Sequence, residues 1–278
     1  MQPLHHYLGL ADGRLHVLEW PSEGPTIVCQ HYMWTAADVW ADLFEALDGR
    51  FRVLSVDAPG HGESDHIDPE DRAETMLAVV NALAGGPAIF IGASNGGLRN
   101  TAFALRHPAL VKRMVLVEPP ILAKPDARDN ERKRVALLPE APRSFEELYS
   151  AYRKFIFPNA DPALLETFLG RIWKEADGAW RQRLTISEIP GEINGFDLKP
   201  QTFARLDMPV LVVAGQNSRL CGPSGADSLR STIRDCTAVV LPDCGHIVHV
   251  NQTPRLHQAI EDFCAPELGA VPSRRAVG

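Results

Sequence analysis

A serine between two glycines is the strongest chemical signal in this 278-residue sequence. Ser94 lies in the segment Ile91-Gly-Ala-Ser-Asn-Gly-Gly, directly after an apolar run and before a helical pattern. A sharp turn from strand to helix crowds the backbone, so its flanking positions must be small, as Gly92 and Gly96 are. Such a turn lifts the serine oxygen above the sheet and close to the first amides of the helix. We therefore predict that Ser94 is a nucleophile.

A serine hydroxyl is a weak nucleophile, so a base must lie within hydrogen-bond reach of it. The best candidate is His246, on a loop that follows the last apolar run and precedes the final helical pattern. A carboxylate that orients this histidine is expected between the two in the chain. Its common position is the loop after Val210–Ala214, but that loop holds no acid and has Ser218 where an aspartate would be expected.

Glu118 is the carboxylate that we predict for the third role. It ends the apolar run Met114–Val117, at the same edge of the predicted sheet as Ser94. As the catalytic acid it would accept the hydrogen of one ring nitrogen of His246 and stabilise the imidazolium that forms during attack. Two alternatives stay open: Glu118 is a structural carboxylate, or Asp227, inside a predicted helix, is the acid.

The elements that must position these residues alternate between strands and helices. Six short apolar runs predict strands, and most of them are continuously apolar, as strands covered on both faces must be. They are Thr26–Cys29, Arg52–Val56, Ala88–Ile91, Met114–Val117, Val210–Ala214 and Ala238–Leu241. The helical patterns between and around them are Ala36–Leu47, Glu70–Leu83, Gly96–Arg106, Ser224–Ile233 and Pro254–Phe263. This order predicts an α/β fold with a mostly parallel, doubly wound sheet.

The alternation breaks between Pro119 and Leu206, which predicts an inserted helical cap over residues 119–206 with no strong strand candidate. Within it, Phe145–Phe155 and Pro162–Lys174 have the spacing of amphipathic helices, and Asp177–Trp180 indicates a turn. The core would then comprise residues 1–118 and 207–265. Residues 266–278 are expected to be a flexible tail.

The composition of the sequence argues against some classes of binding partner. A formal net charge of −7 argues against nucleic acid and anionic membrane surfaces, and no apolar run is long enough for a signal peptide or a membrane span. We expect a cytoplasmic enzyme that acts on a small-molecule substrate without a metal or organic cofactor. Its five cysteines are widely spaced and predict free thiols. The oligomeric state is open, and a homodimer is one alternative.

The Ser94 segment, the Asp57-Ala-Pro-Gly-His-Gly-Glu-Ser turn and the Gly245-His246 loop together resemble the α/β-hydrolase superfamily over Leu15–Phe263. Glu118 narrows the resemblance, since zearalenone lactonases similarly place a glutamate after the sixth strand. The resemblance implies a serine hydrolase that cleaves a small hydrophobic ester or lactone.

The resemblance also implies an oxyanion hole and a substrate pocket. The amide of Asn95 is one expected donor, and the amide of Tyr32 or Met33 is the other. Three tryptophans are candidate substrate contacts, with packing in the protein core as the alternative for each. They are Trp34, Trp173 and Trp180.

Three rival functions share this architecture. Cofactor-independent ring-cleaving dioxygenases are similar in carrying a serine, a histidine and an acid after the sixth strand. Carbon-carbon bond hydrolases usually carry their acid at the position that Ser218 fills here. A non-catalytic binder of small molecules is the third. Dehalogenases and epoxide hydrolases are disfavoured, because their nucleophile is an aspartate.

Overall fold

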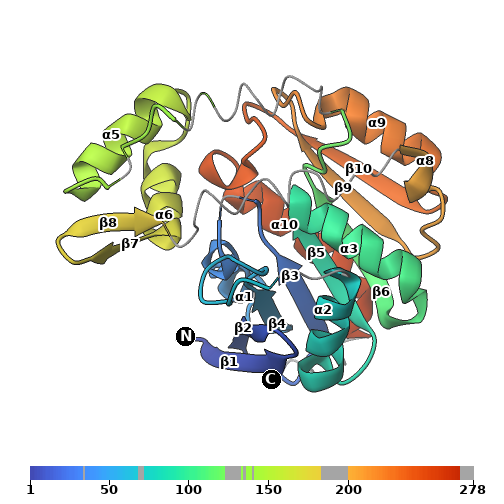
Figure 1. Cartoon of the computed structure of the whole chain (residues 1–278). Coiled ribbons are helices and arrows are strands. Elements are labelled where there is room, and N and C mark those ends of the chain that lie inside the picture. Colours follow the sequence, from blue (N-terminus) through green and yellow to red (C-terminus); the bar gives the residue numbers. More distant parts are fainter. Residues whose placement is uncertain are drawn as a thin grey trace, which may run out of the picture.

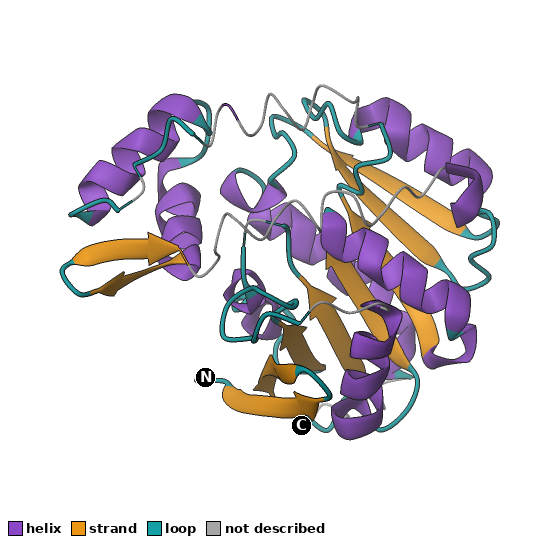
Figure 2. Cartoon of the chain, viewed as in Figure 1, coloured by secondary structure: helices purple, strands orange, loops and turns teal. Residues whose placement is uncertain are grey.

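A computed structural model of the chain describes residues 1–33, 35–67, 72–122, 133, 136–139, 141–182 and 200–269. These residues form an eight-stranded sheet with helices on both faces (Figures 1 and 2), in the order β1-β2-β4-β3-β5-β6-β9-β10. The strands are β1 (Leu4–Leu10), β2 (Gly13–Trp20), β3 (Thr26–Gln30), β4 (Arg52–Val56), β5 (Ala88–Ala93), β6 (Val111–Val117), β9 (Val210–Gly215) and β10 (Cys236–Leu241).

The strands from β4 to β10 in this order are all parallel, and they contain the six predicted strands. Successive side chains enter opposite cores: Ile89 belongs to one buried apolar cluster and its neighbour Phe90 to the other. A strand that is buried on both faces needs a continuous apolar run, which is the pattern that most of these segments share. The exception in burial is β10, an edge strand in which Val240 is 41% exposed. The predicted fold, a mostly parallel doubly wound sheet, is confirmed.

Two sets of helices cover the two faces. One face packs against α1 and α10, and the other against α2, α3, α8 and α9. Their bounds are α1 (Leu43–Ala46), α2 (Arg72–Val79), α3 (Asn95–Arg106), α8 (Pro200–Phe203), α9 (Gly222–Thr232) and α10 (Thr253–Cys264). The long helix predicted over Ala36–Leu47 is a 3-10 helix, Ala37–Trp40, followed by the short α1.

The first two strands were not predicted. β1 and β2 form an antiparallel hairpin, and β2 pairs antiparallel with β4, so the sheet is mixed at this edge. Every second residue of β1 is exposed or polar, because β1 is the edge strand. A search for continuous apolar runs cannot find such a strand.

The inserted segment, predicted as a helical cap without a strong strand candidate, also contains two strands. Its described part has the helices α5, α6 and α8 and a two-stranded hairpin. Figure 1 shows α5, α6 and the hairpin gathered to one side of the sheet, whereas α8 lies beside α9. The turn expected at Asp177–Trp180 is the hairpin turn, where Asp177 and Gly178 both have positive φ (53° and 74°). The elements are α5 (Phe145–Phe155), α6 (Pro162–Ile172), β7 (Trp173–Ala176) and β8 (Ala179–Gln182).

Specific contacts attach this segment to helical elements outside the sheet, and others hold the start of the predicted tail. Arg171 of α6 pairs with Asp42, and the amide of Asp161 donates to the carbonyl of Val250 at 3.0 Å. Glu267, in the predicted tail, accepts from Arg113 of β6 at 2.8 Å, whereas residues 270–278 lie outside the described part. No helix in the described ranges has the length and apolarity needed to cross a membrane.

Candidate active site

The turn between β5 and α3 carries Ser94 in a strained conformation. Its φ of 52° and ψ of −119° are rare for a residue with a Cβ atom. A Cβ at Gly92 would lie 2.5 Å from the backbone of Gly96, and one at Gly96 would lie 2.5 Å from the carbonyl oxygen of Gln30. Both glycines are therefore required by the close approach of three backbone segments, as the sequence pattern predicted.

Ser94, His246 and Glu118 lie in one hydrogen-bonded row. His246 Nε2 is 2.9 Å from Ser94 Oγ, and His246 Nδ1 is 3.0 Å from Glu118 Oε2. An ionised carboxylate only accepts hydrogen bonds, so Nδ1 carries the ring hydrogen and Nε2 is left to accept from the serine hydroxyl. The structure thus brings together the three residues that the sequence singled out.

Glu118 is completely buried where β6 ends, with a φ of 52°. In addition to His246, two groups donate hydrogen bonds to the Glu118 carboxylate. The amide of Gly215 donates to Oε1 at 2.6 Å, and the hydroxyl of Ser218 donates to Oε2 at 2.5 Å. A buried carboxylate without such partners would be costly. The contacts with Gly215, Ser218 and His246 therefore give both oxygens of this buried carboxylate a hydrogen-bond partner.

The role of Ser218 was not predicted from the sequence. It lies on the loop after β9, which pairs in parallel with β6, so the two strands end side by side. The loop that lacks an acid therefore supplies a donor to the acid of the neighbouring strand. By contrast, the Asp227 carboxylate is 71% exposed and pairs with Arg230, so the structure does not place it at His246.

Backbone contacts fix the segment after β3 that would complete an oxyanion hole. Arg99 of α3 donates to the carbonyl oxygen of His31 at 3.0 Å. In a trans peptide the C=O and the following N–H point in opposite directions, so this contact orients the amide of Tyr32. The carbonyl of Tyr32 accepts from the amide of Thr35 at 3.2 Å, which orients the amide of Met33 in the same way.

The His31 ring supports the same segment. Burial is the main cause that lowers its pKa well below the usual value, so the ring is neutral. Its Nε2 accepts from the amide of Ala58 at 3.0 Å, so Nδ1 carries the hydrogen and donates to the carbonyl of Tyr32 at 2.6 Å. The amide of Asn95, at the first position of α3, is the other expected donor.

Replacing Arg99 by methionine should lower kcat about 10- to 100-fold with little change in KM, because an oxyanion donor would lose its fixed direction. Steady-state kinetics with an activated ester measure this split. Arg106→Met, at an exposed position of the same helix, is the control and should behave like the wild type. An unchanged kcat in Arg99→Met would contradict the positioning role.

The Tyr32 side chain packs inside the protein at 1% exposure. Its hydroxyl lies 3.1 Å from Nδ1 of His249, and its ring meets His246 edge-on with centroids 5.9 Å apart. Burial lowers the pKa of His249 well below its usual value, so this histidine is neutral. Tyr32 and His249 thus form a buried wall behind His246.

Acid should destabilise the fold through its buried histidines. Burial lowers the pKa of His257 from 6.5 to about 4, so between these values the unfolded chain binds a proton that the native chain does not. The stability present above pH 6.5 is therefore lost as the pH falls to 4, by an amount on the order of 3 kcal/mol for this residue. The free energy of unfolding, measured with urea from pH 7 to 4, should fall less in His257→Gln than in the wild type. If it fell equally with pH in both proteins, the assignment to His257 would be contradicted.

The candidate substrate tryptophans have packing partners within the inserted segment. The indole of Trp173 is 4% exposed and donates to the Tyr152 hydroxyl at 3.2 Å, and Trp180 packs on Phe145 with ring centroids 5.0 Å apart. These contacts fit the packing alternative, and a role in substrate contact stays a prediction. Trp34 lies outside the described residues.

The five cysteines are free thiols, as predicted. Cys244 lies two residues before His246, and burial raises its pKa to about 11. Because the thiolate is the reactive form, this thiol does not compete with Ser94 as a nucleophile near neutral pH.

Several known proteins are similar to this chain in sequence or in fold. The 2-(acetamidomethylene)succinate hydrolase of Mesorhizobium japonicum is 25% identical over 86% of this chain and 88% of its own. An sn-1-specific diacylglycerol lipase of Mus musculus is 25% identical over 87% and 81%. The crystal structure of an E-2-(acetamidomethylene)succinate hydrolase superposes with a TM-score of 0.84 at 22% identity, covering 95% of this chain and 100% of that one.

The family model described as the alpha/beta hydrolase fold matches residues 25–253, which include Ser94, Glu118 and His246. These relatives carry names of hydrolases, so a hydrolase activity is supported. The chain belongs to the alpha/beta hydrolase fold family.

Proposed function

We propose that this protein hydrolyses a small hydrophobic carboxylic ester or lactone through an acyl-enzyme on Ser94. The observation that carries the proposal is the row of hydrogen bonds from Ser94 through His246 to Glu118, with separations of 2.9 and 3.0 Å. This is the arrangement in which a histidine removes a serine proton while a carboxylate stabilises the resulting imidazolium.

In the first step, the oxygen of Ser94 attacks the substrate carbonyl carbon and its proton moves to Nε2 of His246. The carbonyl oxygen becomes an oxyanion that accepts from the amide of Asn95 and from that of Tyr32 or Met33. When the tetrahedral intermediate collapses, His246 returns the proton to the leaving alkoxide. A lactone would leave this alkoxide attached to the acyl group.

In the second step, a water molecule takes the place of the alcohol. His246 removes a proton from the water, the hydroxide attacks the acyl carbon, and the proton then returns to Ser94. Glu118 remains ionised throughout and holds the ring in place. Neither step calls on a metal or an organic cofactor.

The ester class is supported by the lipase among the relatives, whose name denotes cleavage of an acylglycerol ester. The lactone class rests on the position of the acid after the sixth strand. A second candidate substrate class follows from the other relative: 2-(acetamidomethylene)succinate is a small unsaturated diacid, and that relative aligns over most of both chains.

A labelling experiment combined with a substrate panel tests the proposal. The wild-type protein should react with a fluorophosphonate, and peptide mass spectrometry should locate the adduct on Ser94. The panel comprises aryl esters, aliphatic lactones, an aromatic diketone and 2-(acetamidomethylene)succinate, with an ester or lactone expected to turn over fastest. An unlabelled protein that turns over none of these compounds would contradict a serine hydrolase and favour a binder.

The dependence of the rate on oxygen distinguishes the hydrolase proposal from the dioxygenase alternative. The rate for the best substrate should be the same in air and under strict anaerobiosis, because hydrolysis consumes water only. A rate that requires oxygen would replace the hydrolase proposal with ring cleavage.

A further inference from the structure

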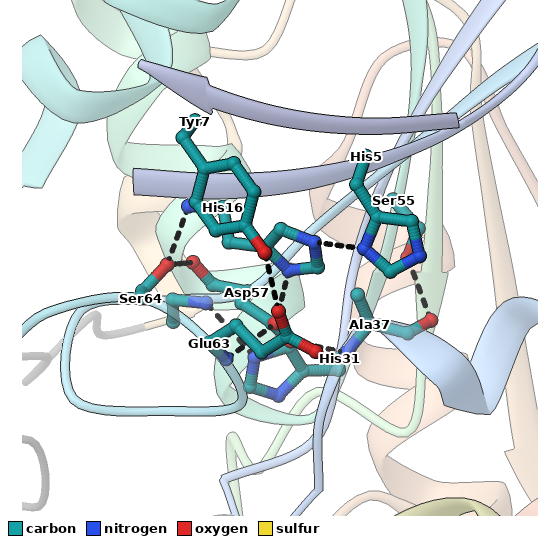
Figure 3. Close-up of polar contacts among 10 residues, drawn as sticks. His5, Tyr7, His16, His31, Ala37, Ser55, Asp57, Glu63 and Ser64 are labelled. Carbon is teal, nitrogen blue, oxygen red and sulfur yellow. Dashed lines mark hydrogen bonds and ion pairs between the residues drawn. The ribbon is translucent and has the colours of Figure 1, made fainter. Parts of the chain in front are cut away.

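A second cluster of chemically capable side chains lies at the β1 edge of the sheet, away from Ser94. Within the described part of the chain, it is the one group in which at least three histidines, cysteines or carboxylates could share a metal ion. Figure 3 shows its members on two neighbouring strands and one loop: His5 and Tyr7 on β1, His16 on β2, and Asp57 and Glu63 after β4. None of them belongs to the Ser94 site.

Strand register brings the two histidines together. Tyr7 is directly opposite His16 in the antiparallel pair, so His5, two residues earlier, lies on the same face as both. Nδ1 of His5 is 2.9 Å from Nε2 of His16, and their ring centroids are 5.1 Å apart. Two imidazole nitrogens therefore already face each other.

Asp57 fixes which nitrogen of His16 is available. Both side chains are fully buried, and Nδ1 of His16 lies 2.7 Å from Oδ2 of Asp57. This carboxylate also accepts from the amides of Ala37 at 2.6 Å and Glu63 at 2.9 Å, so it acts as an acceptor and His16 carries its hydrogen on Nδ1. The lone pair of His16 is then on Nε2, which faces His5. A carboxylate that orients a histidine from behind is the usual support of a metal-ligating imidazole.

Glu63 is the third member of the cluster. Its carboxylate and the facing nitrogens of His5 and His16 all lie within 4.8 Å of one another. The hydroxyl of Tyr7 donates to Oε2 of Glu63 at 2.5 Å and so directs this side chain towards the histidines. Zinc binds nitrogen at about 2.0–2.1 Å, which places tetrahedral ligand atoms about 3.3 Å apart. The two nitrogens must separate by only a few tenths of an ångström to reach that spacing.

We propose that His5 Nδ1, His16 Nε2 and the Glu63 carboxylate bind a divalent ion of the zinc type, with water as the fourth ligand. Two histidines and a glutamate are a ligand set that zinc accepts. Binding requires the hydrogen between the two rings to leave. His5 loses it from Nδ1 and takes up a proton on Nε2, so both imidazoles stay neutral and no net proton is released.

The consequence of binding is a link between three segments. The ion would join β1, β2 and the loop after β4 at an edge where β1 has only one neighbouring strand. Because the ligands come together only in the folded chain, an ion bound there stabilises the native state by mass action. The proposal does not depend on the chemistry at Ser94.

Calorimetric titration with zinc chloride tests the site. The 278-residue chain, stripped with a chelator, should bind one equivalent of zinc, and saturating zinc should raise its Tm by roughly 5 °C. His5→Gln and Glu63→Gln should each weaken binding by more than the roughly 10- to 100-fold typical of losing an outer hydrogen-bond partner. Both replacements keep side-chain polarity, and His5 is exposed, so the fold should survive.

Matched controls exclude other zinc-binding side chains. His6→Gln changes a histidine of the same strand on the opposite face, where it pairs with Glu19 at 2.6 Å, and should bind zinc like the wild type. The double variant His246→Ala/Cys236→Ser lacks a histidine and a cysteine outside the proposed site, and it should still bind one equivalent of zinc. No binding by the wild type, or unchanged affinity in His5→Gln and Glu63→Gln, would overturn the proposal, as would loss of the equivalent in the double variant.

Discussion

Replacing Ser94 by alanine should lower the rate of ester or lactone cleavage by about 10⁴-fold or more and abolish labelling by a fluorophosphonate. The attacking oxygen is then missing, and only the oxyanion donors and substrate binding can still accelerate attack by water. The substitution keeps the Cβ atom, so the strained turn at φ 52° remains as it is and the Tm should change little. Stopped-flow or steady-state rates and intact-protein mass spectrometry measure the two effects.

Ser55→Ala is the matched control for the loss of a buried serine hydroxyl. Ser55 is fully buried on β4 and donates to the carbonyl of Ala37 at 2.9 Å, away from His246. This variant should keep its label and most of its rate, while losing about 1 kcal/mol of stability. Labelling that persists in Ser94→Ala would show that another nucleophile reacts, and the acyl-enzyme proposal would fail.

The central sheet could be predicted because burial on both faces leaves a direct trace in the sequence. β5 illustrates this: all six of its residues are buried, and Ile89 and Phe90 enter opposite apolar clusters. The same logic located the turn at Ser94, because the backbone crowding that requires Gly92 and Gly96 appears as a fixed spacing of glycines.

The strands β1 and β7 were not predicted, for a different reason. β1 and β7 are exposed along most of their length, so their residues alternate or are polar and resemble loops. Asp177-Gly178 was recognised as a turn, and the two positive φ angles there are those of a tight hairpin. An Asp-Gly pair between two short segments was therefore the available signal for β7 and β8.

Residues that hold the site in place could not be predicted, since their partners are distant in the chain. Arg99 is five residues after Ser94, yet its function depends on the carbonyl of His31, 68 residues away. Ser218 was noticed only as a missing acid, although its hydroxyl is 2.5 Å from Glu118. Such contacts depend on the order of the strands in the sheet. That order brings distant segments together and cannot be predicted from the residues near each contact.

Glu118→Gln should lower kcat by about 10³- to 10⁴-fold while the fold stays intact, by analogy with the loss of the orienting acid in other triads. The hydrogen bonds around this side chain explain why. The amide of Gly215 needs an acceptor at Oε1, so the oxygen of the glutamine must occupy that position. Its NH₂ group then replaces Oε2 and faces both Ser218 and His246.

That NH₂ group is a donor, so Nδ1 of His246 would have to accept, and the ring hydrogen would move to Nε2. A protonated Nε2 cannot accept from Ser94, and no carboxylate remains to stabilise an imidazolium. The Ser218 hydroxyl can rotate to accept from the NH₂ group, which is why the Tm should fall little. The ¹H NMR signal of the ring N–H, together with kcat, reports this change of tautomer.

Two further variants separate the acid from its surroundings. Ser218→Ala removes one donor but leaves the carboxylate and its contact with His246, so kcat should fall by only about 10-fold. Asp227→Asn changes an exposed carboxylate and should leave kcat unchanged. If Asp227→Asn were the slow variant and Glu118→Gln the fast one, the acid would lie after β9. The three donors around Glu118 would then serve only to stabilise a buried charge where the inserted segment begins.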